Sequence, residues 1–136
     1  MVTQSHEIKE LILEWSERIA SGEMVTAAEY ILSCEQGFLA IGTGATEWFW
    51  DRADLIRSYG ETAKLGRPEI NVQRIEAYRE GPVGWAVDTV ILRRPGLSEI
   101  SMRHTFVLHQ EGSEWKVIHA HYSFPVPDES TAPAGA

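Results

Sequence analysis

The chain has 136 residues, close to the commonest size of one domain, and 43% of them are hydrophobic, which is enough for a core without staples. The formal net charge of −8 opposes binding to nucleic-acid phosphates and to anionic lipid. One cysteine, Cys34, excludes an internal disulfide, and no apolar run approaches the ~20 residues of a membrane span. We therefore expect a cytoplasmic protein with neither nucleic-acid nor membrane partners.

The first half of the chain is predicted to be mostly helical. Helices are expected over residues 5–22, 23–32 and 51–66, with a short strand over residues 37–44. The first helix places Ile8, Ile12 and Trp15 on one face. Ser5 and Asp51 are suited to cap the first and third helices, because their side-chain oxygens can accept hydrogen bonds from the first turn.

After Pro68 the hydrophobic period changes from about 3.6 to 2, which predicts strands. Four long runs follow, over residues 69–80, 83–94, 98–110 and 114–124. The breaks between them are short, so neighbouring runs should pair as antiparallel hairpins. The order of elements predicts an α+β fold in which helices cover one face of an antiparallel sheet. Residues 128–136 are small, proline-rich and polar, and are expected to form a disordered tail.

Both faces of the predicted sheet carry apolar side chains. In the second run Ala86 and Val90 point one way, and Trp85 and Val87 point the other way. The last run should place on one face Ile118, Ala120, Tyr122 and Phe124, and on the other Trp115 and Val117. The helices can cover one face only. We therefore expect a second copy of the sheet to cover the other face in a homodimer.

Two segments, "IGTGATEWFW" (41–50) and "GSEWKVIHAHYSFPVP" (112–127), together with the order of elements, resemble the SnoaL-like branch of the nuclear transport factor 2-like superfamily. The last strand also resembles that of the association domain of calcium/calmodulin-dependent protein kinase II. The resemblance implies one domain over residues 1–127. Its curved sheet would wrap around the N-terminal helices as a cone with a pocket, and dimers would form through the convex face. The superfamily includes isomerases, cyclases, dehydratases and pocketed proteins without known activity, so the fold does not define a function.

Asp88 and His104 are predicted to point into the pocket from adjacent strands. An unpaired carboxylate in apolar surroundings resists ionisation, so His104 is its natural partner. Such a pair can transfer protons near neutral pH, although a purely structural hydrogen bond would use the same residues. The resemblance to ketosteroid isomerase puts His104 at that enzyme's oxyanion-stabilising acid and Trp15 at its key tyrosine. The isomerase's base would fall near Gly42 or Thr43, where the sequence has no carboxylate, and this argues against steroid isomerisation.

Several other residues are expected to line the pocket, namely Trp15, Tyr30, Glu47, Trp48, Phe106 and Tyr122. Glu47 is interpreted as a pocket base or a rim contact. Trp48 and Tyr30 are alternatively packing residues, because aromatic side chains belong to the core more often than to a ligand site. Tyr59 could also close the pocket. By resemblance, the kinase association domain has arginines at the positions of Asp88, Phe106 and Tyr122, so its preference for acidic ligands is not implied here.

His119 and His121 alternate with pocket-facing residues and are predicted to lie on the convex face, together with Trp85 and Arg103. Their spacing could chelate zinc, but a third ligand is not evident in the sequence. We therefore interpret all four residues as part of a dimer interface and expect no metal.

Two functions remain open. The first is a cofactor-independent isomerase, cyclase or dehydratase that acts on a small apolar or polyketide-like molecule, with Asp88 and His104 transferring protons and Tyr122 orienting the substrate. The second is a non-catalytic ligand-binding or dimerisation domain. An open cavity with Asp88 and His104 in contact favours the first, and a cavity filled by Trp15, Trp48 and Phe106 favours the second.

Overall fold

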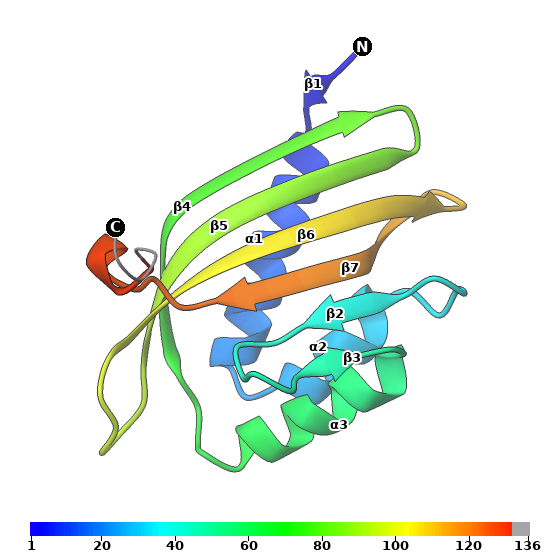
Figure 1. Cartoon of the computed structure of the whole chain (residues 1–136). Coiled ribbons are helices and arrows are strands. Elements are labelled where there is room, and N and C mark those ends of the chain that lie inside the picture. Colours follow the sequence, from blue (N-terminus) through cyan, green and yellow to red (C-terminus); the bar gives the residue numbers. More distant parts are fainter. Residues whose placement is uncertain (132–136) are drawn as a thin grey trace.

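The computed structural model describes residues 1–131 (Figure 1). Its helices are α1 (His6–Ala20), α2 (Met24–Ile31) and α3 (Arg52–Ala63), and a 3-10 turn, η1 (Asp128–Thr131), stands last among the described residues. Its strands are β1 (Thr3–Gln4), β2 (Leu39–Ile41), β3 (Trp48–Phe49), β4 (Glu69–Glu80), β5 (Val83–Arg93), β6 (Ile100–Glu111) and β7 (Glu114–Ser123). The three helices and four long strands predicted from the periodicity are all present.

The strands form one curved, open sheet in the order β1-β4-β5-β6-β7-β2-β3. The long strands β4 to β7 make the predicted antiparallel meander. Helix α1 crosses one face of this sheet, and α2 and α3 lie beside β2 and β3 (Figure 1). This arrangement is an α+β fold in which the sheet bends around the first helix.

The helix caps are those that the sequence predicts. Ser5 Oγ accepts a hydrogen bond from the Ile8 N–H at 3.2 Å, and Asp51 Oδ1 accepts one from the Asp54 N–H at 2.9 Å. Gly22, just beyond the end of α1, has a φ of 87°, which an L side chain rarely adopts. Local chemistry therefore sets where the first and third helices begin and where the first one stops.

Helix α1 and β5 approach each other closely at Gly84. A Cβ atom at this position would overlap Ile8 Cδ1 and lie 2.9 Å from the Tyr78 carbonyl oxygen. Ile8 itself is fully buried in the core between α1 and the sheet. The glycine is therefore required here by space, because its φ is not unusual.

The facing of the last strand differs from the prediction. Trp115 and Val117 are buried at 5% and 0% exposure, and the Trp115 indole N–H donates to Glu7 Oε2 of α1 at 3.1 Å. A register shift opposite Val107 and Leu108 leaves Ile118 unpaired, so the alternation reverses there. The expectation that Trp115 and Val117 face away from the helices is wrong, because a bulge changes which side chains point inward.

Strand β2 connects the long meander to the short strand β3. Strand β2 pairs in parallel with β7 and antiparallel with β3, and neither pairing follows from the sequence pattern. In the tail expected to be disordered, Asp128–Thr131 form η1, and residues 132–136 lie outside the described part of the chain. No helix within residues 1–131 is long and apolar enough to cross a membrane.

Candidate functional site

A cavity of about 340 Å³ opens on the concave face of the sheet, a volume that suits a small ligand. Inner side chains of β5, β6 and β7 form one wall, and residues of α1 and α3 form the other. The lining is mostly apolar and includes Ile12, Leu55, Val90, Leu92, Ile100 and Met102. Trp15 and Phe106 line the cavity as predicted but do not fill it.

Asp88 and His104 meet inside this cavity. They are register partners on β5 and β6, and the distance from His104 Nδ1 to Asp88 Oδ1 is 2.6 Å. The Asp88 side chain is 2% exposed and the His104 side chain 16% exposed. A carboxylate can only accept, so Nδ1 carries the shared hydrogen when the imidazole is neutral. The Nε2 atom then keeps its lone pair, and it has no protein partner among residues 1–131.

Tyr59 of α3 and Tyr122 of β7 bring two hydroxyl groups to the same cavity, and these hydroxyls are hydrogen-bonded to each other. Burial raises the pKa of Tyr59 well above its ordinary value, and the neighbouring Tyr122 raises it further. Burial also raises the pKa of Tyr122, and the negative charge of Asp88 adds to this increase although the hydrogen bond from Tyr59 opposes it. Both hydroxyls therefore stay protonated at neutral pH.

Aromatic rings connect the tyrosine pair to the histidine. The Tyr122 ring meets the His104 ring edge-on, with 5.0 Å between centroids. Phe106 lies 5.7 Å from His104 and 5.5 Å from Trp15, centroid to centroid. These contacts restrict the orientation of the imidazole, whose Nε2 lone pair can accept a proton.

Glu47 lines the cavity from the turn before β3. Its Oε1 atom accepts a hydrogen bond from the Gly44 N–H at 2.5 Å. A Cβ atom on Gly42 or Gly44 would lie 3.1 or 2.7 Å from the same oxygen, so both glycines make room for the carboxylate. The sequence has no acid at Gly42, but the folded turn brings the Glu47 carboxylate over it. The folded chain therefore has a carboxylate beside Gly42, and the expectation against steroid isomerisation stays a prediction.

Arg94, just beyond the end of β5, also lines the cavity and was not predicted to do so. Its Nε donates to the Gly66 carbonyl at 3.2 Å, and no acidic side chain pairs with it in the described part of the chain. Partial burial lowers the pKa of its guanidinium. Asp88, Val90 and Leu92 continue to Arg94 with the period of two of a strand, which is a signal that the sequence contained.

Two predicted pocket residues lie elsewhere. Tyr30 is 49% exposed on the outer side of α2, where its ring lies 4.0 Å from the Lys116 ammonium group. Trp48 is 56% exposed and stacks on Trp50 with 5.9 Å between centroids. Phe49 faces the cavity instead, because adjacent residues of a strand point to opposite sides.

The four residues predicted for a dimer interface lie on the convex side of the sheet. Trp85 stacks on Tyr78, and Arg103 Nε donates to Ser123 Oγ at 3.2 Å. His119 Nδ1 lies 3.1 Å from the Leu39 carbonyl oxygen, while His121 is exposed. Neither histidine belongs to a cluster of three possible metal ligands within residues 1–131.

The chain belongs to the SnoaL-like domain family, whose model matches residues 8–127. This match covers most of the chain, including both the dyad of Asp88 and His104 and the tyrosine pair. No curated protein matches the chain by sequence.

Solved structures of the nuclear transport factor 2-like superfamily share the fold. A protein of unknown function from Pseudomonas putida has a TM-score of 0.81 at 17% identity, covering 96% of this chain and 95% of its own. A proposed dehydratase from Streptomyces avermitilis has a TM-score of 0.76 at 14% identity, with 89% and 95% covered. A proposed calcium/calmodulin-dependent protein kinase II association domain from Xanthomonas campestris has a TM-score of 0.71 at 19% identity, with 93% and 90% covered. At these identities the likeness concerns the fold alone.

Proposed function

We propose that this SnoaL-like protein binds a small, largely apolar molecule in the cone cavity and moves a proton on it, as an isomerase, cyclase or dehydratase does. The observation that carries the proposal is the 2.6 Å contact between His104 Nδ1 and Asp88 Oδ1 beside an open cavity. Asp88 holds the imidazole in the tautomer whose Nε2 atom can take a proton from the bound molecule and return it.

The tyrosine pair supports a substrate that carries a carbonyl group. The two hydroxyls share one hydrogen bond, which leaves one hydroxyl hydrogen to donate to a ligand oxygen. When a proton leaves the carbon beside a carbonyl, negative charge develops on the carbonyl oxygen, and a fixed donor stabilises that charge. Glu47 is a second carboxylate at the cavity wall and could share the proton transfer.

Arg94 supports a ligand with an anionic group at its other end. The register places Val90 beside Met102 and Leu92 beside Ile100, so two apolar rungs separate the dyad from Arg94. The six residue steps from Asp88 to Arg94 cover roughly 20 Å along the strand, and the arginine side chain can shorten this distance by its own reach. An unpaired, partly buried guanidinium favours carboxylate or phosphate. The substrate class is therefore an elongated apolar carbonyl compound with an anionic end.

A non-catalytic ligand-binding domain is the second candidate. The observation in its favour is that Asp88 bonds to His104 and Tyr59 bonds to Tyr122. These polar side chains therefore have hydrogen-bond partners without a ligand in the cavity. A protein that only binds a ligand also needs hydrogen-bond partners for its buried polar groups. Catalysis differs from binding in needing His104 for turnover.

Proton exchange tests the catalytic proposal. Long-chain oxo acids with a ketone beside exchangeable C–H groups are incubated in D₂O, and NMR follows deuterium uptake while ligand-observed NMR follows binding. We expect wild-type protein to accelerate exchange, His104→Gln to reduce it about 100-fold or more, and Asp88→Asn to reduce it less. His6→Gln, at an exposed site far from the cavity, should match wild type. Binding without exchange in wild type would leave the non-catalytic candidate, and no binding would overturn both.

Arg94→Gln tests the anionic end of the ligand separately. Wild type should bind an oxo acid about tenfold or more tightly than its methyl ester, because the ester lacks the charge that the guanidinium attracts. The variant should bind both equally, which isothermal titration calorimetry can measure. Equal affinities in wild type would remove the anionic group from the proposal and leave the proton transfer untouched.

A further inference from the structure

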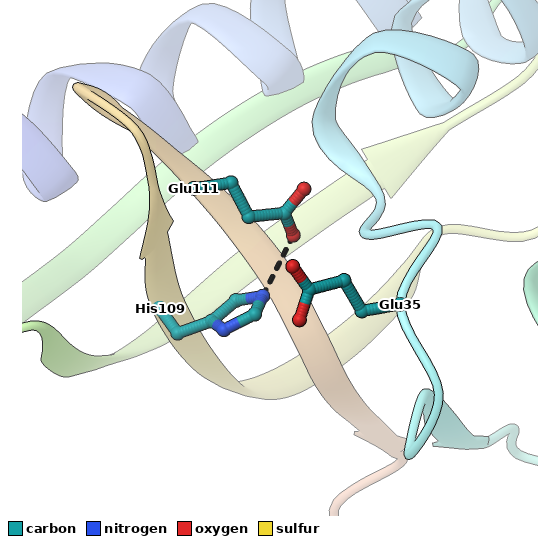
Figure 2. Close-up of side chains that lie close together, drawn as sticks. All are labelled: Glu35, His109 and Glu111. Carbon is teal, nitrogen blue, oxygen red and sulfur yellow. Dashed lines mark hydrogen bonds and ion pairs between the residues drawn. The ribbon is translucent and has the colours of Figure 1, made fainter.

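A second cluster of functional side chains lies outside the cavity, where the loop after α2 meets the end of β6. It contains Glu35, His109 and Glu111, and none of the three lines the cavity. Figure 2 shows the Glu35 carboxylate facing the gap between the His109 ring and the Glu111 carboxylate. The ligand atoms of the three side chains lie within 4.8 Å of one another. From this geometry we propose a binding site for a divalent transition-metal ion, with His109, Glu111 and Glu35 as its ligands.

The donor set and spacing fit such an ion. One imidazole nitrogen and two carboxylate oxygens suit Zn²⁺ or Mn²⁺ better than Mg²⁺, which prefers oxygen ligands alone. Zinc ligands lie about 2.0–2.2 Å from the ion, so ligand atoms around one ion are about 3–4 Å apart. The His109 Nε2 to Glu111 Oε2 distance is 2.7 Å, and Glu35 is exposed and free to adjust. A small movement would place all three around one ion.

Ser33 hydrogen-bonds to two of the proposed metal ligands, Glu111 and Glu35. Its side chain is fully buried, and its hydroxyl donates to Glu111 Oε2 at 2.6 Å while accepting from the Glu35 N–H at 3.0 Å. The Ser33 N–H donates to the Val117 carbonyl at 2.8 Å, which anchors the loop to β7. Groups of this kind, which orient metal ligands through hydrogen bonds, are a regular part of metal sites.

The protein pairs the Glu111 carboxylate with His109 and Ser33, but it leaves the Glu35 carboxylate without a partner among residues 1–131. Two carboxylates lie close to one imidazole. An ion pair between a glutamate and the histidine would need only one of these carboxylates. Lys116 is the nearby cation, but its ammonium group bonds to the Tyr30 carbonyl at 2.6 Å and to Glu114 Oε2 at 3.1 Å. The Glu35 carboxylate has no hydrogen bond or ion pair within the described residues. A dication would remove the repulsion between the two glutamates.

Metal titration tests this site with metal-stripped protein of residues 1–136. Isothermal titration calorimetry with Zn²⁺, and separately with Mn²⁺, should give one ion per chain. Glu35→Gln should weaken binding at least about tenfold, since even outer-sphere changes cost that much. This variant should fold, because the Glu35 side chain makes no bond in the described structure. His109→Ala should have at least the same effect, and Mn²⁺ should broaden the His109 ring signals in NMR.

The His-x-His pair on the convex face provides the control. His121→Ala should leave the affinity unchanged, because His121 lies outside the cluster. Unchanged affinity in Glu35→Gln, loss of binding in His121→Ala, or no saturable binding in wild type would each overturn the proposal. These readouts do not depend on the cavity or on any catalytic activity.

Discussion

The Nδ1 atom of His104 bonds to Asp88, and the rest of the imidazole ring packs against Tyr122 and Phe106. A histidine on a strand has no particular reactivity by itself. Here the buried carboxylate determines which nitrogen keeps its lone pair, and the aromatic neighbours limit how the ring can turn. The reactivity proposed for this residue thus depends on three side chains from three strands.

The buried hydroxyls of Tyr59 and Tyr122 should make the free energy of unfolding depend on pH. Below about pH 10 both hydroxyls are protonated in the folded and unfolded states, so they add no pH dependence. Above about pH 10 the unfolded chain releases these protons while the folded chain keeps them, because the pKa values of Tyr59 and Tyr122 are raised. The free energy of unfolding should then fall with rising pH by about 1.4 kcal/mol per pH unit for each hydroxyl.

Urea unfolding between about pH 9 and about pH 11 measures this slope. The double variant Tyr59→Phe/Tyr122→Phe should show a shallower decline than wild type, while Tyr30→Phe, at an exposed site, should behave as wild type. Identical slopes in wild type and the double variant would show that the two hydroxyls are not buried as described.

Among single residues, the dyad could be predicted from the strand pattern, whereas the place of Glu47 at the pocket was predicted without support from any periodicity. Asp88 and His104 lie within regular strands, so period-two alternation and hairpin pairing were enough to bring them together. Glu47 reaches the cavity through a turn whose path depends on two glycines and a bond to Gly44. Tyr30 and Trp48 were predicted to line the cavity because they are aromatic, but residue type does not reveal which way a side chain points.

At the scale of elements, α1 and β5 are in tight contact at Gly84. Gly84→Ala should destabilise the protein by about 1–3 kcal/mol, because the new Cβ atom would press on Ile8 and on the Tyr78 backbone. Gly60→Ala is a matched control within α3, where a Cβ atom would have no neighbour within 4 Å. It should stabilise the protein by about 0.5–1 kcal/mol through helix propensity. Urea denaturation compares both, and a neutral Gly84→Ala would contradict the tight packing.

Strand β7 illustrates how one extra residue changes an element. Perfect alternation would place Trp115 and Val117 on the convex face, but the bulge at Ile118 turns both toward α1 and α2. The C-terminal part of the strand keeps the predicted facing, so Ala120 is buried and Tyr122 lines the cavity. A bulge depends on the fit between neighbouring strands, and a periodic pattern in one strand does not contain it.

For the whole molecule, association through the convex face stays a prediction. The register aligns Tyr78, Trp85, Val107 and His119 in one row across four strands, with Leu39 at its end. Val87, in the adjacent row, is 42% exposed, and Leu39 is equally exposed. An apolar row of this kind can be covered by a second copy of the same face, which is the isologous contact of a twofold dimer.

Light scattering coupled to size-exclusion chromatography tests this arrangement. Wild type should have twice the 15.3 kDa mass of one chain. Val87→Glu should shift the protein to one chain, since the new charges would face each other across the twofold axis. Leu97→Glu, at an exposed position in the β5–β6 turn, should leave the mass unchanged. A monomeric wild type would contradict the predicted dimer.

The sequence by itself determined the three helices, the caps of α1 and α3, the four long strands and the Asp88–His104 pairing, because each depends on neighbours in the chain or on a simple alternation. Tertiary structure decided the reversal within β7, the parallel pairing of β2 with β7, and the approach of Glu47 to Gly42. It also brought Glu35 to His109 and Glu111 across more than seventy residues. Contacts of this second kind depend on how loops close and how strands fit together, and these properties have no periodic trace in the chain.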